Sequence, residues 1–123
     1  MLKILRLILD ENITTFSIDY DDNTIIYRTK TQIWDDISKY YRMVEWGDDF
    51  SINIDTFISR CKKYAYKNGY IVLSGYHQNN INTFQAKCFG WISETVDNKC
   101  NFNNITELAA VLNAINYIRD KHV

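Results

Sequence analysis

Residues 104–119, NITELAAVLNAINYIR, decide the fold because they form the clearest helical pattern in the chain. Apolar residues recur at steps of three and four, as on one face of an α-helix; they are Ile105, Leu108, Leu112, Ile115 and Ile118. Asn104 and Glu107 have the spacing of a capping box, and Arg119 suits the negative carboxyl end of the helix dipole. The pattern predicts a helix that starts at residue 104, packs on a sheet and buries Leu112 and Ile115.

The length of 123 residues predicts one small domain, residues 1–123, because one core suffices at this size. Apolar residues make up 46% and charged residues 24%, close to globular averages, so neither disorder nor a membrane protein is indicated. The apolar start MLKILRLIL is interrupted by Arg6 and lacks a small-residue cleavage site, so it is not read as a signal peptide. Cys61, Cys88 and Cys100 lack a paired spacing, which is typical of free thiols in a reducing cytoplasm.

Periodicity and turn residues predict the other elements. We expect a helix over 2–10, a hairpin of strands 14–20 and 24–29, a helix over 32–46, an extended piece at 50–54, a helix over 55–68, and a hairpin of strands 70–77 and 83–93. Residues 94–103 are expected to form a polar connection. The order, approximately α-ββ-α-α-ββ-α, predicts an α+β fold in which an antiparallel sheet from two hairpins packs against three to four helices.

The sequence shows no catalytic constellation. His77 ends a predicted strand and His122 precedes the last residue, so neither has a base or ligand partner nearby in sequence. Three adjacent Asp pairs begin at Asp21, Asp35 and Asp48, but neighbouring residues occupy different faces, so a pair is not a chelate. The glycines are isolated, unlike those of a phosphate-binding loop. We therefore expect no enzyme, no metal and no cofactor.

Charge and aromatic content favour a binding protein. Residues 1–55 contain eleven acids and six bases, a net charge of −5, whereas residues 56–123 contain four acids and eight bases, a net charge of +4. A dipolar surface of this kind steers and orients a charged partner. The nine Tyr, six Phe and three Trp exceed what one core needs, and exposed rings are enriched in recognition surfaces.

The main hypothesis is a small non-catalytic binding protein that inhibits a protein partner by occluding it. The bias toward Asn, Ile, Lys and Tyr is typical of AT-rich genomes. It suits an anti-defence protein of a phage or mobile element, such as an anti-CRISPR-like inhibitor, or a toxin-immunity protein. The predicted partner-binding surface is aromatic and acidic and comprises Tyr20, Asp21, Asp22, Tyr27, Tyr40, Trp46, Asp48 and Asp49. No membrane partner is expected, and the chain is expected to be a monomer or a homodimer.

Two alternatives stay open. The first is a nucleic-acid-binding module that uses the cations and rings of the helix over 60–67, namely Arg60, Lys62, Lys63, Tyr64 and Lys67. A solvated helix face with cations toward its carboxyl end explains the same pattern. The second is a protein that binds or sequesters a nucleotide-like small ligand between Tyr76, His77 and Trp91, which we expect near one end of the second hairpin.

Overall fold

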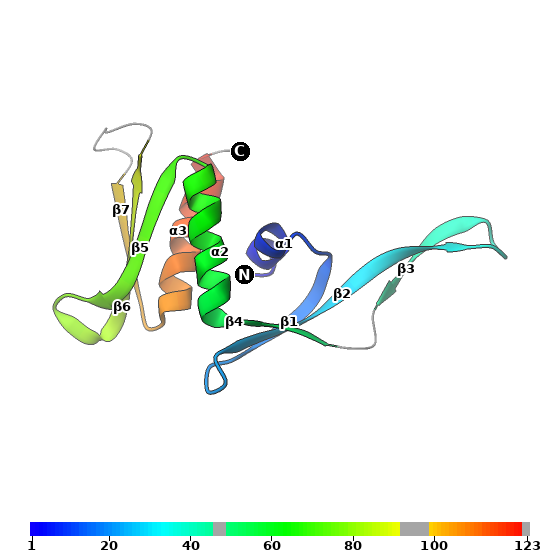
Figure 1. The fold of residues 1–123 in the computed structure, drawn as a ribbon, viewed down its shortest axis with the longest axis horizontal. Helices are drawn as coiled ribbons and strands as arrows, with labels where there is room; N and C mark the ends of the chain where they lie inside the picture. The colour runs from blue at the N-terminus through cyan, green and yellow to red at the C-terminus, as the bar shows by residue number, and fades with distance from the viewer. Residues whose placement is uncertain (46–48, 92–98, 122–123) are drawn as a thin grey trace. The chain divides into compact units, whose positions relative to one another are not determined.

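The computed structural model describes residues 1–45, 49–91 and 99–121. It confirms the α+β class with antiparallel strands, but the two predicted hairpins belong to two separate sheets rather than to one. The chain forms two compact units, an amino-terminal unit (Met1–Asp55) and a carboxy-terminal unit (Thr56–Val123), each with its own sheet (Figure 1). The boundary coincides with the change in charge along the sequence, so the first unit carries −5 and the second +4.

The amino-terminal unit is built on one long strand. Its elements are α1 (Leu2–Leu9), β1 (Ile13–Asp19), β2 (Thr24–Asp35), β3 (Tyr40–Glu45) and β4 (Phe50–Asn53). The first half of β2 pairs antiparallel with both β1 and β4, which therefore occupy its two edges, and the second half pairs with β3. α1 packs against β1 and buries Ile4 and Leu5. It ends at Asp10, which takes the left-handed backbone conformation (φ 53°) that Asp tolerates.

The predicted helix over 32–46 is wrong. Its residues up to 45 form the second half of β2, a turn and β3, and Lys39 adopts a positive φ of 57° in that turn. Trp34 and Tyr41 explain the error. Residues seven apart share a face of a helix, but these two also lie directly opposite each other across the hairpin. The apolar pattern therefore fits both a helix and a hairpin. The pairing of β2 with β3 decides in favour of the hairpin.

The carboxy-terminal unit is a three-stranded antiparallel sheet covered by helices. Its elements are α2 (Ile54–Lys67), which begins at the unit boundary, β5 (Tyr70–His77), β6 (Asn80–Gly90), β7 (Lys99–Asn104) and α3 (Glu107–Lys121). The strand order is β5-β6-β7, and α3 packs against all three strands. Figure 1 shows α2 and α3 on the same side of this sheet. The core includes Phe57, Cys61, Ala65, Val72, Ala86, Cys88, Leu108, Val111, Ile115 and Ile118.

β7 corrects the expectation that residues 94–103 only connect two elements. Residues 99–104 pair with residues 84–89 of β6 along their whole length. The segment KCNFNN carries one large apolar residue, Phe102, and so lacks the alternation that marks a strand in the sequence. It is an edge strand, in which backbone pairing with β6 outweighs side-chain propensity.

α3 begins later than the sequence predicts. Its first turn is capped by Thr106, whose Oγ1 accepts a hydrogen bond from the backbone N–H of Ala109 at 3.1 Å. Asn104 instead accepts a bond from the N–H of Ile105, and Ile105 lies before the helix with 74% of its surface exposed. The expected capping box and the place of Ile105 in the apolar stripe are therefore wrong.

Thr106→Ala should lower the free energy of unfolding by about 1 kcal/mol, because it removes the N-cap of α3. Asn104→Ala should cost less, since its side chain caps no helical N–H. Urea unfolding of the two variants, followed by circular dichroism, measures both values. A larger loss for Asn104→Ala would place the start of α3 at the earlier residue.

Candidate functional site

We call residues 30–45, the second half of β2 together with β3, the arm. Its register runs from the pair Lys30 and Glu45 to the pair Asp35 and Tyr40. β1 pairs with β2 only as far as Thr29 and β4 only as far as Tyr27, so the arm continues beyond both (Figure 1). At about 3.3 Å per residue, this two-stranded ribbon is about 17 Å long.

One face of the arm carries three exposed apolar side chains. Trp34, Tyr41 and Met43 are 47%, 60% and 52% exposed. Trp34 and Tyr41 are cross-strand partners, and Met43 follows Tyr41 by two residues, so strand alternation puts all three on the same face. The two rings meet edge to face with centroids 5.1 Å apart, and the Trp34 Nε1–H donates to Asp36 Oδ1 at 2.7 Å. These contacts hold the rings in place at the surface.

The opposite face of the arm and its turn also carry exposed side chains. Tyr40 is 54% exposed and Arg42 is exposed, and Ile37 in the turn is 96% exposed. Trp, Tyr, Met and Arg are the residues enriched in protein interfaces and their hot spots. A two-stranded hairpin is at best marginally stable alone, and exposed apolar patches favour association. Core packing therefore does not explain these exposed side chains.

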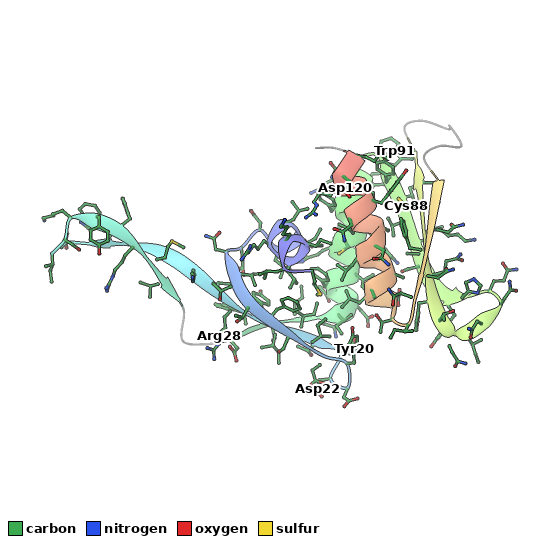
Figure 2. All side chains as sticks on the ribbon, turned by 180° about the vertical axis from the view of Figure 1, so that it is seen from behind. Tyr20, Asp22, Arg28, Cys88, Trp91 and Asp120 are labelled. Carbon is green, nitrogen blue, oxygen red and sulfur yellow. The ribbon has the colours of Figure 1, made fainter. Side chains whose placement is uncertain are left out.

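The predicted acidic and aromatic surface is divided between the two ends of β2. Tyr20, Asp21 and Asp22 lie in the turn before β2, where Asp19 accepts hydrogen bonds from the N–H groups of Asp21 and Asp22 (Figure 2). Tyr40 lies opposite the last residue of β2. β2 has twelve residues, so these ends are about 36 Å apart at 3.3 Å per residue. The predicted residues do not form one patch.

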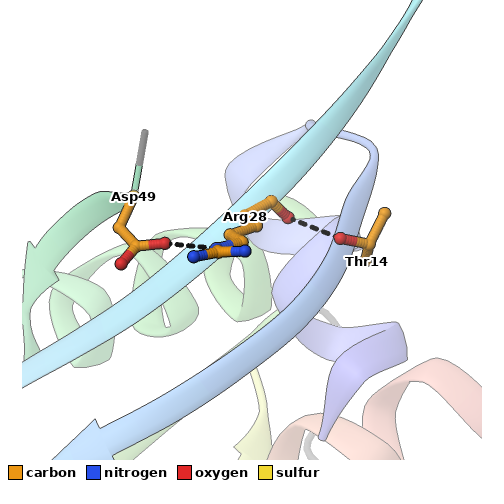
Figure 3. A network of polar contacts seen from close by, with 3 residues as sticks. All are labelled: Thr14, Arg28 and Asp49. Atoms are coloured by element: carbon orange, nitrogen blue, oxygen red, sulfur yellow. Dashed lines mark hydrogen bonds and ion pairs between the residues drawn. The ribbon is translucent and has the colours of Figure 1, made fainter. Parts of the chain in front are cut away.

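Of two further predicted residues, one is buried and the other is engaged in an ion pair. Tyr27 is only 8% exposed and stacks on Phe50 with centroids 5.9 Å apart, so the prediction of a surface ring there is wrong. Asp49 forms an ion pair with Arg28 at 2.6 Å, with both side chains about half exposed (Figure 3). The Thr14 hydroxyl donates to the Arg28 carbonyl at 3.4 Å beside this pair. Trp46 and Asp48 lie outside the described residues.

Three basic residues of α2 lie on one exposed face at steps of three and four, as predicted. Arg60, Lys63 and Lys67 are exposed, and Lys62 and Tyr64 are half-buried. The predicted set omits Tyr66, which is 58% exposed and stacks on Trp91. The arrangement brings cations and exposed rings together, and a role in nucleic-acid binding stays a prediction.

The three rings proposed for a small ligand do not converge. Tyr76 stacks on Phe84 near the β5–β6 turn, and the neighbouring His77 accepts a hydrogen bond from the N–H of Asn79. Trp91 lies at the opposite end of the hairpin, where its backbone N–H donates to the carbonyl of Gly69 at 2.9 Å. The register of β5 with β6 separates Tyr76 from that end by six residues, or about 20 Å. The expectation of one shared end is wrong.

A depression of about 490 Å³ lies in the amino-terminal unit. It is lined by Arg6, Asp10, Glu11, Asn12, Thr29, Lys30 and Phe50. The lining includes both acids and bases, and the Arg6 Nε–H donates to the carbonyl of Ile13 at 2.8 Å. Across the described ranges, no group of three His, Cys, Asp or Glu side chains is arranged to hold a metal ion. In that same part of the chain, the helices are too short or too polar to span a bilayer.

Cys61 should be unreactive in the folded protein. Burial raises the pKa of its thiol from 9.0 to about 12, and the thiolate is the reactive form. Near pH 8, alkylation of Cys61 should be roughly a thousandfold slower in the folded than in the unfolded chain, because three pKa units separate the two states. Since folding raises this pKa, the buried thiol lowers stability only above about pH 9, where the unfolded thiol ionises.

Labelling with iodoacetamide, with and without denaturant, followed by peptide mapping measures the rate for each cysteine. Equal rates for Cys61 in the two conditions would contradict its burial.

The arm is thus an exposed ribbon that carries side chains of the kinds enriched in protein interfaces. No protein-family model, curated protein or solved structure matches this chain.

Proposed function

We propose that this protein is a non-catalytic binding protein that occludes a protein partner, and that the arm makes the central contact. The supporting observation is the exposed cluster of Trp34, Tyr41 and Met43 on one face of a ribbon. Rings fixed before binding lose little conformational entropy on association, which is why preorganised aromatic residues make strong anchors. The cross-strand ring contact and the Trp34–Asp36 hydrogen bond provide that order.

The charge of the same unit favours a basic partner. The amino-terminal unit has a net charge of −5. Asp21 and Asp22 are exposed at one end of β2, and Asp36 is exposed beside the arm turn. Acidic groups around an apolar contact speed encounter with a positively charged surface and disfavour acidic partners. A nucleic-acid-binding enzyme has such a surface, so an anti-defence inhibitor or a toxin-immunity protein is the concrete form of the proposal.

Photo-crosslinking tests this proposal and identifies the partner. Benzoylphenylalanine placed at residue 41 should capture a basic protein from the source host. The matched control has the same group at residue 76, because Tyr76 is also an exposed strand tyrosine in contact with a neighbouring ring, but in the other unit. The expected result is a product at residue 41 that is absent at residue 76.

Three results would contradict the proposal. One is equal capture at the two positions, and a second is no capture at residue 41 in any growth condition of the host. The third is a product whose peptides belong only to a second copy of this chain, since the arm would then serve self-association rather than occlusion of another protein.

A further inference from the structure

α2 presents a continuous positive surface. Residues 56–68 contain four cations and no acid. Arg60, Lys63 and Lys67 follow one another at steps of three and four, so their side chains are neighbours on the exposed helix face. Lys62 precedes Lys63 in the sequence and is half-buried.

The helix dipole does not account for these cations. It favours positive charge within the last turn of a helix, and Lys67 is the basic residue there. Arg60, Lys62 and Lys63 lie before that turn. Three of the four cations therefore have no role in stabilising the carboxyl end of α2.

An exposed ring platform adjoins the cations. Tyr66 lies one helical turn after Lys62 and Lys63, so it is next to both on the helix surface. Its ring stacks on Trp91 with centroids 5.1 Å apart and an angle of 18° between the planes. The Trp91 Nε1–H donates to the Tyr66 carbonyl at 3.0 Å, yet Trp91 and Tyr66 are still 45% and 58% exposed. The platform is held in place and open to solvent.

We propose that this face of α2 binds single-stranded nucleic acid, with Arg60, Lys63 and Lys67 on phosphates and the Tyr66–Trp91 platform stacking a base. Charge complementarity supports this ligand, since the carboxy-terminal unit has a net charge of +4. Single-strand binding sites combine a positive track with aromatic rings because every base has a flat face to stack. Bases in a duplex are already stacked on one another, so a duplex would contact only the cations of this surface and not the ring platform. This site is in the other unit from the arm and does not rest on the proposed function.

Fluorescence anisotropy with a labelled oligothymidine of about 16 nucleotides tests the site. For three phosphate contacts, affinity should fall about twentyfold between about 50 and about 200 mM salt. Lys63→Glu should weaken binding about tenfold at the lower salt and reduce the salt effect to about sevenfold, because one contact is lost. Tyr66→Leu should weaken binding about fivefold and leave the salt effect unchanged.

Lys87→Glu is the matched control. It makes the same charge change in the same unit, at an exposed position of β6. Its strand neighbours Ala86 and Cys88 are buried, so Lys87 lies on the face of β6 opposite to theirs. It should leave affinity within about twofold, as should Tyr41→Ala in the arm. Circular dichroism checks that each variant is folded.

Three results would overturn the inference. The first is no binding of the oligothymidine at the lower salt. The second is equal losses for Lys63→Glu and Lys87→Glu, which would indicate nonspecific charge attraction. The third is duplex binding as tight as single-strand binding and insensitive to Tyr66→Leu, which would assign the surface to phosphates without base stacking.

Discussion

Ile115→Ala should lower the free energy of unfolding by about 2 to 5 kcal/mol, because it opens a cavity in the core of the carboxy-terminal unit. Ile115 is fully buried in α3, the helix that packs on all three strands of the carboxy-terminal sheet. Truncation removes buried methyl and methylene groups and leaves a space that a close-packed interior fills only in part. The position therefore measures how firmly α3 holds the unit together.

Leu112→Ala is the matched comparison in the same helix. The prediction that Leu112 is buried is wrong, because this residue is half-buried in α3. Part of its side chain remains in water in the folded protein, so its truncation should cost clearly less. Urea unfolding followed by far-ultraviolet circular dichroism gives both free energies. An equal or larger loss for Leu112→Ala would mean that α3 is rotated and turns a different face toward the sheet.

Trp34→Ala and Tyr41→Ala should each weaken binding of the crosslinked partner by about 2 kcal/mol or more, which is about thirtyfold. Removing a fixed ring from the centre of an interface mainly speeds dissociation. Asp21→Lys with Asp22→Lys should instead slow association, and high salt should remove that effect because it acts through long-range attraction. Surface plasmon resonance at two salt concentrations separates the two rates.

The control for the arm variants is Tyr76→Ala, which removes an equally exposed tyrosine from the other unit. It should leave both rates unchanged. The arm variants themselves should change the free energy of unfolding by no more than about 1 kcal/mol, since the truncated rings are about half exposed. Loss of affinity in Tyr76→Ala, or unchanged affinity in both arm variants, would move the binding surface out of the arm.

Most elements could be predicted because their local signals agree with their surroundings. The first hairpin has alternating β-branched and aromatic residues around Asp21, Asp22 and Asn23, and Asn23 adopts the positive φ of 54° that such a turn requires. The helix over 55–68 has an apolar stripe that ends before Gly69, which also takes a positive φ. In these segments, side-chain periodicity and backbone preferences indicate the same structure.

The candidate site was less predictable because its residues belong to a segment whose apolar pattern fits both a helix and a hairpin. A helix over 32–46 would have buried Trp34 and Tyr41 in its apolar stripe, whereas the hairpin leaves both at the surface. The error for Tyr27 is the opposite one, because its ring is predicted at the surface and is buried. β2 pairs on both of its edges, and this pairing puts the Tyr27 ring against Phe50. Exposure depends on which strands pair, and that information is spread over distant parts of the chain.

Hydrogen exchange of the protein, free and bound to its crosslinked partner, tests the central claim most directly. In the free protein, amides of the arm should exchange quickly because the ribbon pairs only with itself among the described residues. On binding, peptides covering residues 34–43 should become protected by about tenfold or more, while those covering residues 70–90 should not change. Protection confined to the carboxy-terminal unit, with an arm that still exchanges quickly, would contradict the assignment of the arm as the binding surface.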